Sequence, residues 1–456
     1  MSSNTALTGN GIVNTHKEQS ETALSWTAVA AWFMCSLFYF YQYAVRSAPP
    51  VMRANMSATW GVDPVGHMIS LYYVVYSFMA LIAGTLLDRY GDRKTLPYAT
   101  FFVAACCLLL ASGSEQLGVV GFVAQAAGAI FGFIGAVYVA AKYLPPQQLP
   151  FFVGGTQMLG MAGAAFGTKP VHAAIDGAAH TWPWEDVWFF FAVIGALLAI
   201  GMWSVLRREK ETDAKPKPSL SLKELIKPYQ IVFENPQTYL CGLIGGLLFA
   251  PTTIGILVWA TEFLHEGRHV SLADATTDAM LVPIGWIIGC PLVGYISGRI
   301  GRRKPVLIAG ALLLLLSLTI ALYIPIGFAL RYVIALAIGL ASGAAMIPFS
   351  VVKEVNPDEV KGSAAGAMNF LCFMVTGLLA PVFERLLRPA NGHVESLHEF
   401  QHGLSPLIYG VVAAIVLACF LRETGMAARD HEHATGAPAV PPLDHAANLG
   451  LPSPAR

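Results

Sequence analysis

The chain has 456 residues, of which 55% are hydrophobic and only 12% are charged. Soluble domains carry about 25% charged residues, so the composition excludes an ordinary soluble protein and indicates a membrane protein with several spans. The 28 basic and 28 acidic residues cancel. Net charge therefore says nothing about partners, because the side of the membrane on which the charges lie matters more.

Residues 1–24 are polar and lack a cleavable signal pattern, so we expect them to form a tail before a retained first helix. Twelve runs of roughly twenty mostly apolar residues follow, each long enough to cross a hydrocarbon core of about 30 Å as a helix. The expected spans lie near residues 25–48, 66–87, 96–113, 117–142, 149–169, 186–206, 237–262, 276–298, 304–325, 330–353, 362–385 and 404–422.

One long polar insertion, at 207–236, divides these runs into two sets of six. We predict an all-α polytopic protein with one six-helix bundle at 25–206 and a second at 237–422. The stretch 423–456 is rich in Ala, Pro and His and is expected to be a disordered tail. The seven cysteines lie in apolar runs without metal-ligand spacing, so packing explains them and no metal or cofactor is expected.

The loops differ in their content of lysine and arginine. If the N-terminus is cytoplasmic, the loops on that side hold about seventeen basic residues and the opposite loops about six. The positive-inside rule therefore places both termini and the central loop 207–236 in the cytoplasm. We expect a multi-pass protein of a bacterial inner membrane, with the lipid bilayer as its surroundings, monomeric and without a nucleic-acid partner.

Two loops repeat one another. GTLLDRYGDRK at 84–94 returns as GYISGRIGRRK at 294–304. Five positions match at a constant offset of 210 residues: Gly84 and Gly294, Arg89 and Arg299, Gly91 and Gly301, Arg93 and Arg303, Lys94 and Lys304. A constant offset indicates a duplicated unit. Because each unit has an even number of spans, both enter the membrane from the same side, as a parallel repeat.

The first loop, with Gly84, Leu86, Asp88, Arg89, Gly91, Arg93 and Lys94, resembles the signature loop of the major facilitator superfamily. The resemblance covers residues 25–422. It implies two six-helix bundles around a central cavity that opens alternately to each side, and it implies that helices one, four, seven and ten line that cavity.

The chemistry of the loop suggests a conformational latch. Gly84 is expected to let the second span approach a neighbour closely, and Gly91 to permit the turn. Asp88 is placed to accept hydrogen bonds from Arg89, from Arg93 or from a helix N-terminus of the other bundle. The alternative is that Arg93 and Lys94 are only positive-inside anchors. Gly298 replaces the acid in the second copy, so we expect the N-terminal copy to dominate.

Arg46 is the most informative polar residue, because a charge in a span costs several kcal/mol unless it faces water, a partner or a substrate. Phenols and amides accompany it at helical spacing: Tyr39, Gln42 and Tyr43 in the first span, Tyr72 and Tyr76 in the second. This set suits capture of a carboxylate or phosphate. The alternative is that Arg46 extends to the outer interface or binds loop carbonyls.

Four further residues remain open between two roles. Gln157 and Asn369 occupy nearly equivalent places in the two halves and either line the cavity or bond neighbouring helices. Glu262 and His265 lie near the outer end of the seventh span, where they either couple transport to protons or form an exposed rim pair.

No nucleotide-binding loop, catalytic triad spacing or metal cluster occurs in the sequence, so an enzyme or an ATP-driven pump is not expected. We predict a secondary transporter that takes up a small organic anion with protons. Two alternatives stay open: proton-driven efflux of an amphipathic or drug-like compound, and a non-transporting signalling or adaptor protein on the same fold.

Overall fold

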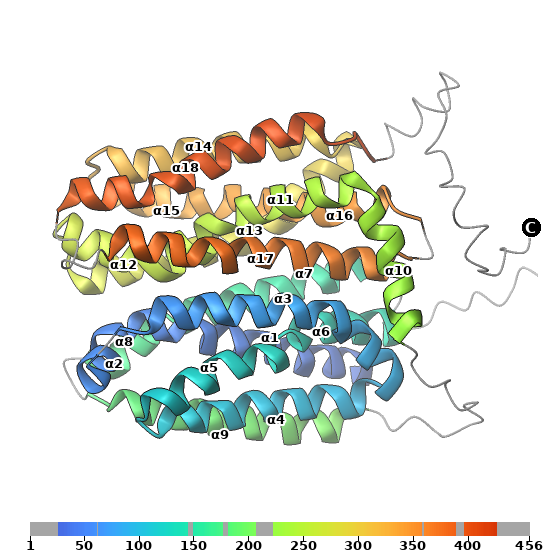
Figure 1. Cartoon of the computed structure of the whole chain (residues 1–456), viewed down its shortest axis with the longest axis horizontal. Coiled ribbons are helices and arrows are strands. Elements are labelled where there is room, and N and C mark those ends of the chain that lie inside the picture. Colours follow the sequence, from blue (N-terminus) through green and yellow to red (C-terminus); the bar gives the residue numbers. More distant parts are fainter. Residues whose placement is uncertain are drawn as a thin grey trace, which may run out of the picture.

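A computed structural model describes residues 26–61, 63–144, 149–176, 181–206, 222–357, 360–388 and 396–425. The predicted tails at 1–24 and 423–456 lie outside this part of the chain, apart from residues 423–425. Within it every regular element is a helix, and the long helices run side by side in two groups, blue to green and yellow to red (Figure 1).

The first group follows the first half of the chain. Its helices are α1 (Trp26–Val51), α2 (Arg53–Trp60), α3 (Val65–Tyr90), α4 (Asp92–Ala111), α5 (Glu115–Ala129), α6 (Phe131–Tyr143), α7 (Leu149–Phe166), α8 (Lys169–Asp176) and α9 (Trp184–Val205). α5 and α6 form one span, Glu115–Tyr143.

The second group follows the second half. Its elements are α10 (Leu222–Glu234), α11 (Pro236–Ala250), the π-helix η2 (Pro251–Trp259), α12 (Ala260–Glu262), η3 (Phe263–Gly267), α13 (Leu272–Ile300), α14 (Lys304–Tyr323), α15 (Phe328–Ser342), the 3₁₀ turn η4 (Gly343–Met346), α16 (Ile347–Glu354), α17 (Lys361–Leu387) and α18 (Leu397–Phe420). α11 to η3 form one span, and α15 to α16 form another.

Each of the twelve predicted runs coincides with one of these helical spans. Eleven of the spans are long and apolar enough to cross a membrane by length and composition, and α7 occupies the remaining run near 149–169. The all-α membrane fold is therefore confirmed. Three short amphipathic helices were not predicted: α2, α8 and α10. The last of these lies in the segment that the sequence analysis treated as a loop.

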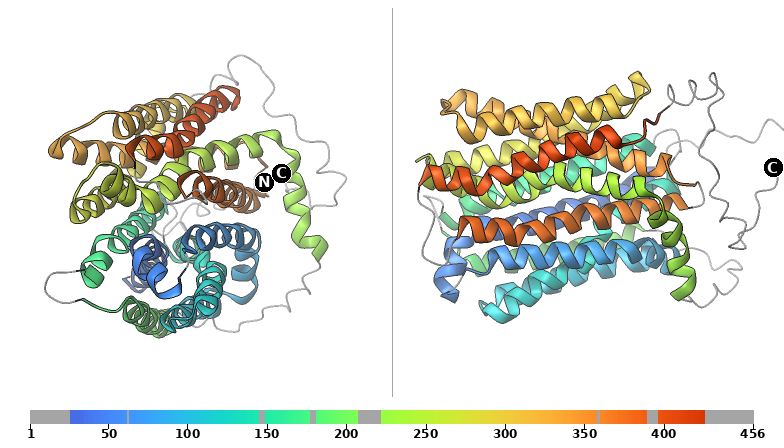
Figure 2. Two further views of the ribbon diagram at one scale, coloured as in Figure 1. Left: turned by 60° about the vertical axis from the view of Figure 1, so that its left-hand side comes forward. Right: turned by 45° about the horizontal axis from the view of Figure 1, so that its top comes forward.

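The short helices mark the two ends of the molecule. α10 lies at one end, called here the α10 end, and α2 and α8 lie at the other, called the α2 end (Figures 1 and 2). α10 joins both halves, because it continues into α11 while the Tyr229 hydroxyl donates a hydrogen bond of 2.7 Å to the carbonyl of Leu81 in α3. The two halves also meet along α3 with α17 and along α7 with α13.

Small residues set the closest approaches within each half. Gly163 of α7 and Gly167, just after it, face the backbone of α1, and Gly285 and Gly289 of α13 face the backbone of α15, so a side chain at any of them would collide. Gly84 does not act in this way: a Cβ atom there would meet open space. The prediction that Gly84 brings α3 close to a neighbour is wrong, because Gly84 lies on a side of α3 where a Cβ atom would contact nothing.

Candidate functional site

One face of α1 runs along the boundary between the two halves. Tyr39, Tyr43 and Arg46 lie on this face at spacings of four and three residues, which keeps them on one side of a helix. Pro50 comes one turn later and Arg53 begins α2. From Tyr39 toward Arg53, this face of α1 passes an aromatic cavity, then the buried Arg46 and then a group of ion pairs. These three levels of the site therefore follow one another along α1.

The aromatic level is a small central cavity between the two halves. Its wall contains residues of both halves: Tyr39, Tyr43, Tyr76, Ile130, Phe133, Ile134, Gln157, Phe249, Met346, Phe349, Asn369 and Phe373. Five of the eight predicted binding residues thus meet at one cavity. The Tyr39 hydroxyl donates to the side-chain oxygen of Gln157 at 3.2 Å, and Gly160 leaves the room that the Tyr39 ring occupies.

Arg46 lies in the next level toward the α2 end. It is only 5% exposed, and its guanidinium carbon lies 3.8 Å from the ring centre of Tyr43 and 5.4 Å from that of Tyr73. Among the described residues, none gives its three guanidinium nitrogens a hydrogen-bond partner. Cation–π contacts partly offset the desolvation of the charge, but a buried guanidinium without an acid remains costly.

The position of Arg46 can be compared with the two roles considered for it, at a cavity or at the outer interface. The side chain neither reaches the outer interface nor binds a loop carbonyl; it lines a second small cavity with Pro50, Ile69, Tyr72, Tyr73, Phe122, Thr253, Leu257 and Val258. The last three belong to η2 of the other half. Gln42 lies behind this wall, where its amide oxygen is 3.5 Å from the Tyr72 hydroxyl. All eight predicted binding residues are therefore placed at or beside these two cavities.

Three site residues escaped the sequence analysis. Tyr73 was not among the predicted residues, in contrast to Tyr72 and Tyr76. Its ring stacks on that of Phe373 at 5.7 Å and faces Arg46. Thr253 comes from η2, which begins at Pro251, a residue that lacks the backbone N–H needed for the regular α-helical bond. Tyr73 is three residues from Tyr76, which is helical spacing, so a signal existed. Phe373 carried no such signal.

The α2 end of the boundary is closed by ion pairs between the halves. Arg388, at the end of α17, pairs with Asp63 of the first half at 2.6 Å and with Glu262 at 2.8 Å. Arg53 pairs with the same two acids at 3.5 Å. We call Arg53, Asp63, Glu262 and Arg388 the α2-end gate.

The gate encloses an aromatic residue and borders a cavity. Arg53 lies 4.5 Å from the ring centre of Trp259, and Arg388 lies 5.7 Å from it. A cavity of about 610 Å³ is lined by Arg53, Glu262 and Arg388 together with His172, His265 and Pro50. We call this cavity the vestibule. Pro50 also lines the Arg46 cavity, so the vestibule and the Arg46 level are neighbours.

The two residues proposed for proton coupling are thus separated in role. Glu262 belongs to the gate and is half-buried rather than exposed at a rim. His265 lies in the vestibule wall, with Nδ1 2.8 Å from the carbonyl oxygen of Val270 and Nε2 3.7 Å from Glu266. As the structure describes them, Glu262 and His265 line the same cavity, but they form neither a hydrogen bond nor an ion pair with each other.

The first signature loop lies at the α10 end. Gly91 has φ +76°, as the turn prediction requires. Arg93 donates to the carbonyl of Leu206 at 2.5 Å, which binds it to the end of α9 within its own half. Arg89 faces Tyr90, and Lys94 is exposed. The Asp88 side chain, on which the latch prediction depends, lies outside the described side chains.

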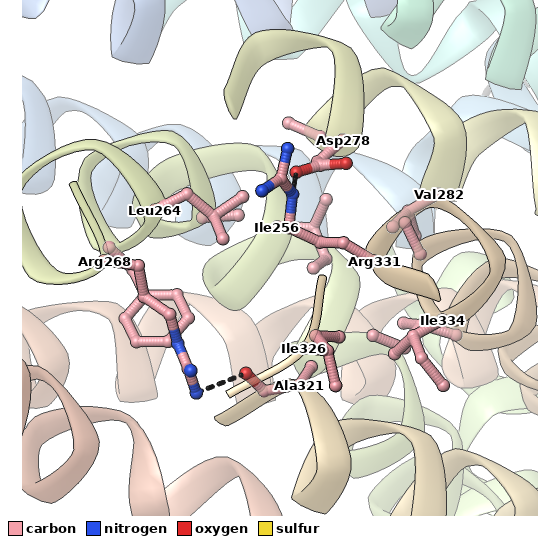
Figure 3. A pocket seen from close by; sticks show the side chains of 14 residues that line it. Ile256, Leu264, Arg268, Asp278, Val282, Ala321, Ile326, Arg331 and Ile334 are labelled. Carbon is pink, nitrogen blue, oxygen red and sulfur yellow. Dashed lines mark hydrogen bonds and ion pairs between the residues drawn. The ribbon is translucent and has the colours of Figure 1, made fainter. Parts of the chain in front are cut away.

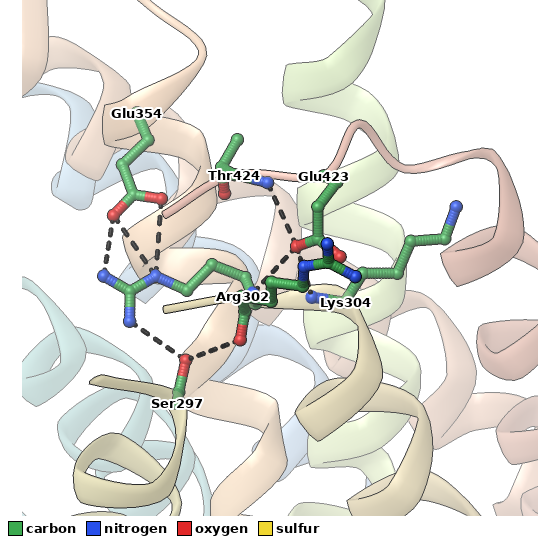
Figure 4. A network of polar contacts seen from close by, with 7 residues as sticks. Ser297, Arg302, Lys304, Glu354, Glu423 and Thr424 are labelled. Atoms are coloured by element: carbon green, nitrogen blue, oxygen red, sulfur yellow. Dashed lines mark hydrogen bonds and ion pairs between the residues drawn. The ribbon is translucent and has the colours of Figure 1, made fainter. Parts of the chain in front are cut away.

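The second copy of the loop forms a polar network (Figure 4). Arg303 pairs with Glu354 at 2.8 Å and donates to Ser297 at 2.9 Å. Glu423 accepts from the backbone N–H groups of Arg303 and Lys304. Lys304 also donates to the carbonyl of Cys419. The second copy itself has Gly298 in place of the acid, but Glu354 of α16 and Glu423, which follows α18, bring two acids to it from elsewhere in the chain.

The other positions of the second copy have simpler surroundings. Gly301 makes the turn, with φ +68°. Gly294 faces open space, as Gly84 does. Arg299 is exposed and binds the Tyr295 hydroxyl at 3.1 Å. The first half also has an ion pair between its third and fourth spans, Asp92 with Lys142 at 2.9 Å, although these positions do not match Arg303 and Glu354 at the offset of 210 residues.

Comparison with known proteins agrees with this architecture. A model described as Major Facilitator Superfamily matches residues 31–381. The multidrug transporter MdfA of Edwardsiella ictaluri (strain 93-146) is 27% identical over 279 residues, which are 58% of this chain and 63% of that relative. The match thus spans slightly less than two thirds of that protein.

Two relatives match over a longer stretch. The multidrug transporter MdfA of Shigella boydii serotype 4 (strain Sb227) is 26% identical, over 80% of this chain and 87% of its own. The probable galactarate/D-glucarate transporter GudP of Escherichia coli (strain K12) is 21% identical over the same shares.

Solved structures share the fold. An inward-facing bacterial homologue of the human lysosomal transporter Spinster superimposes with TM-score 0.64 at 14% identity, over 87% of this chain and 96% of that chain. A D-xylose–proton symporter superimposes with TM-score 0.62 at 16% identity, over 86% and 96%.

Proposed function

The chain belongs to the major facilitator superfamily, so it is a multi-pass membrane transporter rather than an enzyme, and we propose that it takes up a small organic anion together with protons. Alternating access of the two halves would carry the anion from the vestibule at the α2 end to the opposite side. On this proposal the α10 end faces the cytoplasm, both termini lie there, and the protein works as a monomer in a bacterial inner membrane.

Arg46 is the observation that carries the proposal. Its guanidinium is buried between the halves, and among the described residues neither an acid nor another hydrogen-bond partner satisfies it. A carboxylate would supply both, because guanidinium and carboxylate form two parallel hydrogen bonds. The tyrosine hydroxyls of the neighbouring cavity add donors, and the rings of Tyr43, Tyr76 and Phe373 add an apolar wall.

The relatives support the proposal in part. One of them is named for galactarate and D-glucarate, which are organic anions. The α2-end gate supplies a means of coupling: Glu262 and Asp63 together hold Arg53 and Arg388, so protonation of either acid would weaken the closure of that end. We propose Glu262, with His265 in the same vestibule, as the proton-responsive pair.

Efflux of a drug-like compound is the second candidate. Several relatives, including the two MdfA proteins described above, are named multidrug transporters, and the central cavity has more aromatic than polar residues in its wall. An exporter of cationic drugs would need an acidic side chain at the central cavity. Among the described residues that line the central cavity and the Arg46 cavity, the charged one is Arg46, which is a cation.

Transport in vesicles of both orientations tests the two candidates. Right-side-out vesicles are given a panel of labelled aliphatic and aromatic carboxylates and their neutral amides, with and without an inward proton gradient. We expect saturable, gradient-dependent accumulation of a carboxylate that Arg46→Ala abolishes. Accumulation that Arg46→Ala leaves unchanged would refute the anchor. Proton-driven accumulation of ethidium by inverted vesicles, without uptake of any acid, would establish efflux instead.

A further inference from the structure

A second set of cavities lies inside the C-terminal half, away from the boundary between the halves. One is lined by residues of η2, α12, η3, α13, α14 and α15 and by Ile326, and it has about 80 Å³ of free space. An adjoining one, toward α18, has about 60 Å³ and shares Ile256, Ala260, Phe263, Ala321 and Ile338 with the first. Neither shares a residue with the central cavity or the Arg46 cavity.

The walls are almost wholly apolar, and three of the lining side chains are charged: Arg268, Asp278 and Arg331 (Figure 3). Asp278 pairs with Arg331 and is nearly buried. Arg268 lies across the cavity and donates two hydrogen bonds to the carbonyls of Ala321 and Leu322 at the end of α14, at 3.2 and 2.9 Å.

These three side chains do not satisfy one another. Arg268 Nε, Arg331 Nη2 and Asp278 Oδ1 are buried without a hydrogen-bond partner among the described residues. Asp278 pairs with Arg331, whereas no described acid pairs with Arg268, so the cavity carries one excess positive charge. The nearest acids along the chain are engaged elsewhere, because Asp274 accepts from Ser271 and Glu266 lies beside His265.

We propose that this is a binding site for a small amphipathic anion, namely a medium-chain carboxylate whose head binds Arg268. An apolar cavity of about 150 Å³ stays dry and accommodates benzene, and the two adjoining cavities together approach that size. The apolar wall therefore fits a short alkyl chain, and the excess positive charge fits a carboxylate. The site is separate from the transport path and independent of the proposed function.

The occupant would lie against η2, the π-helical segment that also contributes Thr253, Leu257 and Val258 to the Arg46 cavity. Ile256 of the same segment lines the proposed site. A bound carboxylate would therefore contact the back of the helix that faces Arg46.

Photolabelling tests the proposal directly. The full-length protein in lipid nanodiscs is exposed to a diazirine derivative of octanoate, and the labelled peptides are mapped by mass spectrometry. We expect saturable labelling near Ile256, Leu264 and Ile334, competed by octanoate but not by octanol. Arg268→Gln should weaken it about tenfold, as expected for loss of a charge-assisted hydrogen bond. Ala335→Leu, which fills the cavity, should abolish it.

Two controls keep the result interpretable. Arg299→Gln, at the opposite end of the molecule, and Arg46→Gln, in the transport path, should leave this labelling unchanged. Competition by octanol as strong as by octanoate would overturn the assignment of an anion. Labelling spread over lipid-facing residues and unaffected by Ala335→Leu would overturn the site itself. Arg331→Gln is avoided because it would leave Asp278 buried and unpaired.

Discussion

Arg46 and Arg53 lie seven residues apart on the same side of the boundary between the halves, yet their surroundings are opposite. Arg53 meets Asp63 and Glu262 and stacks on Trp259. Arg46 lies against the rings of Tyr43 and Tyr73 and has no acid partner among the described residues. Since an unpaired buried charge costs several kcal/mol, the paired arginine stabilises one arrangement of the halves. The unpaired one is a place where a ligand can add stability.

The comparison extends to Arg388, which bridges two acids from different halves. Breaking that bridge should change which conformation is populated, whereas changing Arg46 should remove affinity without changing the balance of conformations. Structural and substrate-binding arginines are therefore distinguished by different measurements.

Arg46→Gln should have the largest effect on transport. Loss of a bidentate charge-assisted contact of about 3 kcal/mol corresponds to about a hundredfold loss in affinity, to be measured as uptake of the carboxylate identified in vesicles. Thermal stability of the substrate-free protein should stay equal or rise, because the unpaired charge is removed. Arg46→Lys keeps the charge and should recover part of the uptake. Loss of stability with unchanged uptake would assign Arg46 a structural role.

Arg388→Gln should have the next largest effect, on conformation. Without this bridge the α2 end should open more often, so a cysteine at Thr253 should react about tenfold faster with a membrane-impermeant maleimide added on that side. The measurement is the labelling rate in a background that lacks other reactive cysteines. Arg385→Gln, three residues earlier, is the matched control, since no gate contact involves it. Equal rates in the two variants would remove the gate.

Exchanging the charges of Arg303 and Glu354 should have a moderate effect, on stability. Either Arg303→Glu or Glu354→Arg alone places like charges together and should destabilise the protein by about 1–3 kcal/mol, whereas the double exchange should restore much of the loss. The first half has an ion pair between the same two spans, Asp92–Lys142, in which the third span carries the acid. Thermal unfolding in detergent measures the coupling. Additive single effects would contradict it.

Arg299→Gln should have the smallest effect. The side chain is exposed, and within the described part of the chain it donates a hydrogen bond to the Tyr295 hydroxyl. Such surface contacts contribute about 0–1 kcal/mol. Transport and melting temperature should both remain close to those of the parent.

Asp88→Asn, in the copy of the loop that has its own acid, should reduce transport strongly while expression and substrate binding persist. Equal losses in the two variants would contradict the asymmetry of the two copies.

Several features of the molecule could be predicted because they depend on local runs of residues. Each span is a continuous apolar stretch whose length matches a membrane, and the turns at Gly91 and Gly301 need positive φ. The sequence also singled out Arg46 as a charge within such a stretch, although it left open whether the side chain faces the cavity or the outer interface. The helix α10 was missed because its amphipathic pattern is interrupted by Pro228.

The partners of the charged residues could not be predicted, because they come from helices far apart in the chain. Arg388 and Asp63 are separated by more than three hundred residues in the numbering, and Arg303 finds Glu354 across a helix pair. Gly84 shows the converse, since a motif position that suggests close packing faces open space.

By itself the sequence determined the number of spans, the repeat and the presence of a charge within the first span, because hydrophobic length and repeat spacing are properties of the chain alone. The tertiary structure decided which charges are paired and which are not, because pairing depends on which helix ends the packing brings together. That difference separates the arginines of the gate from Arg46.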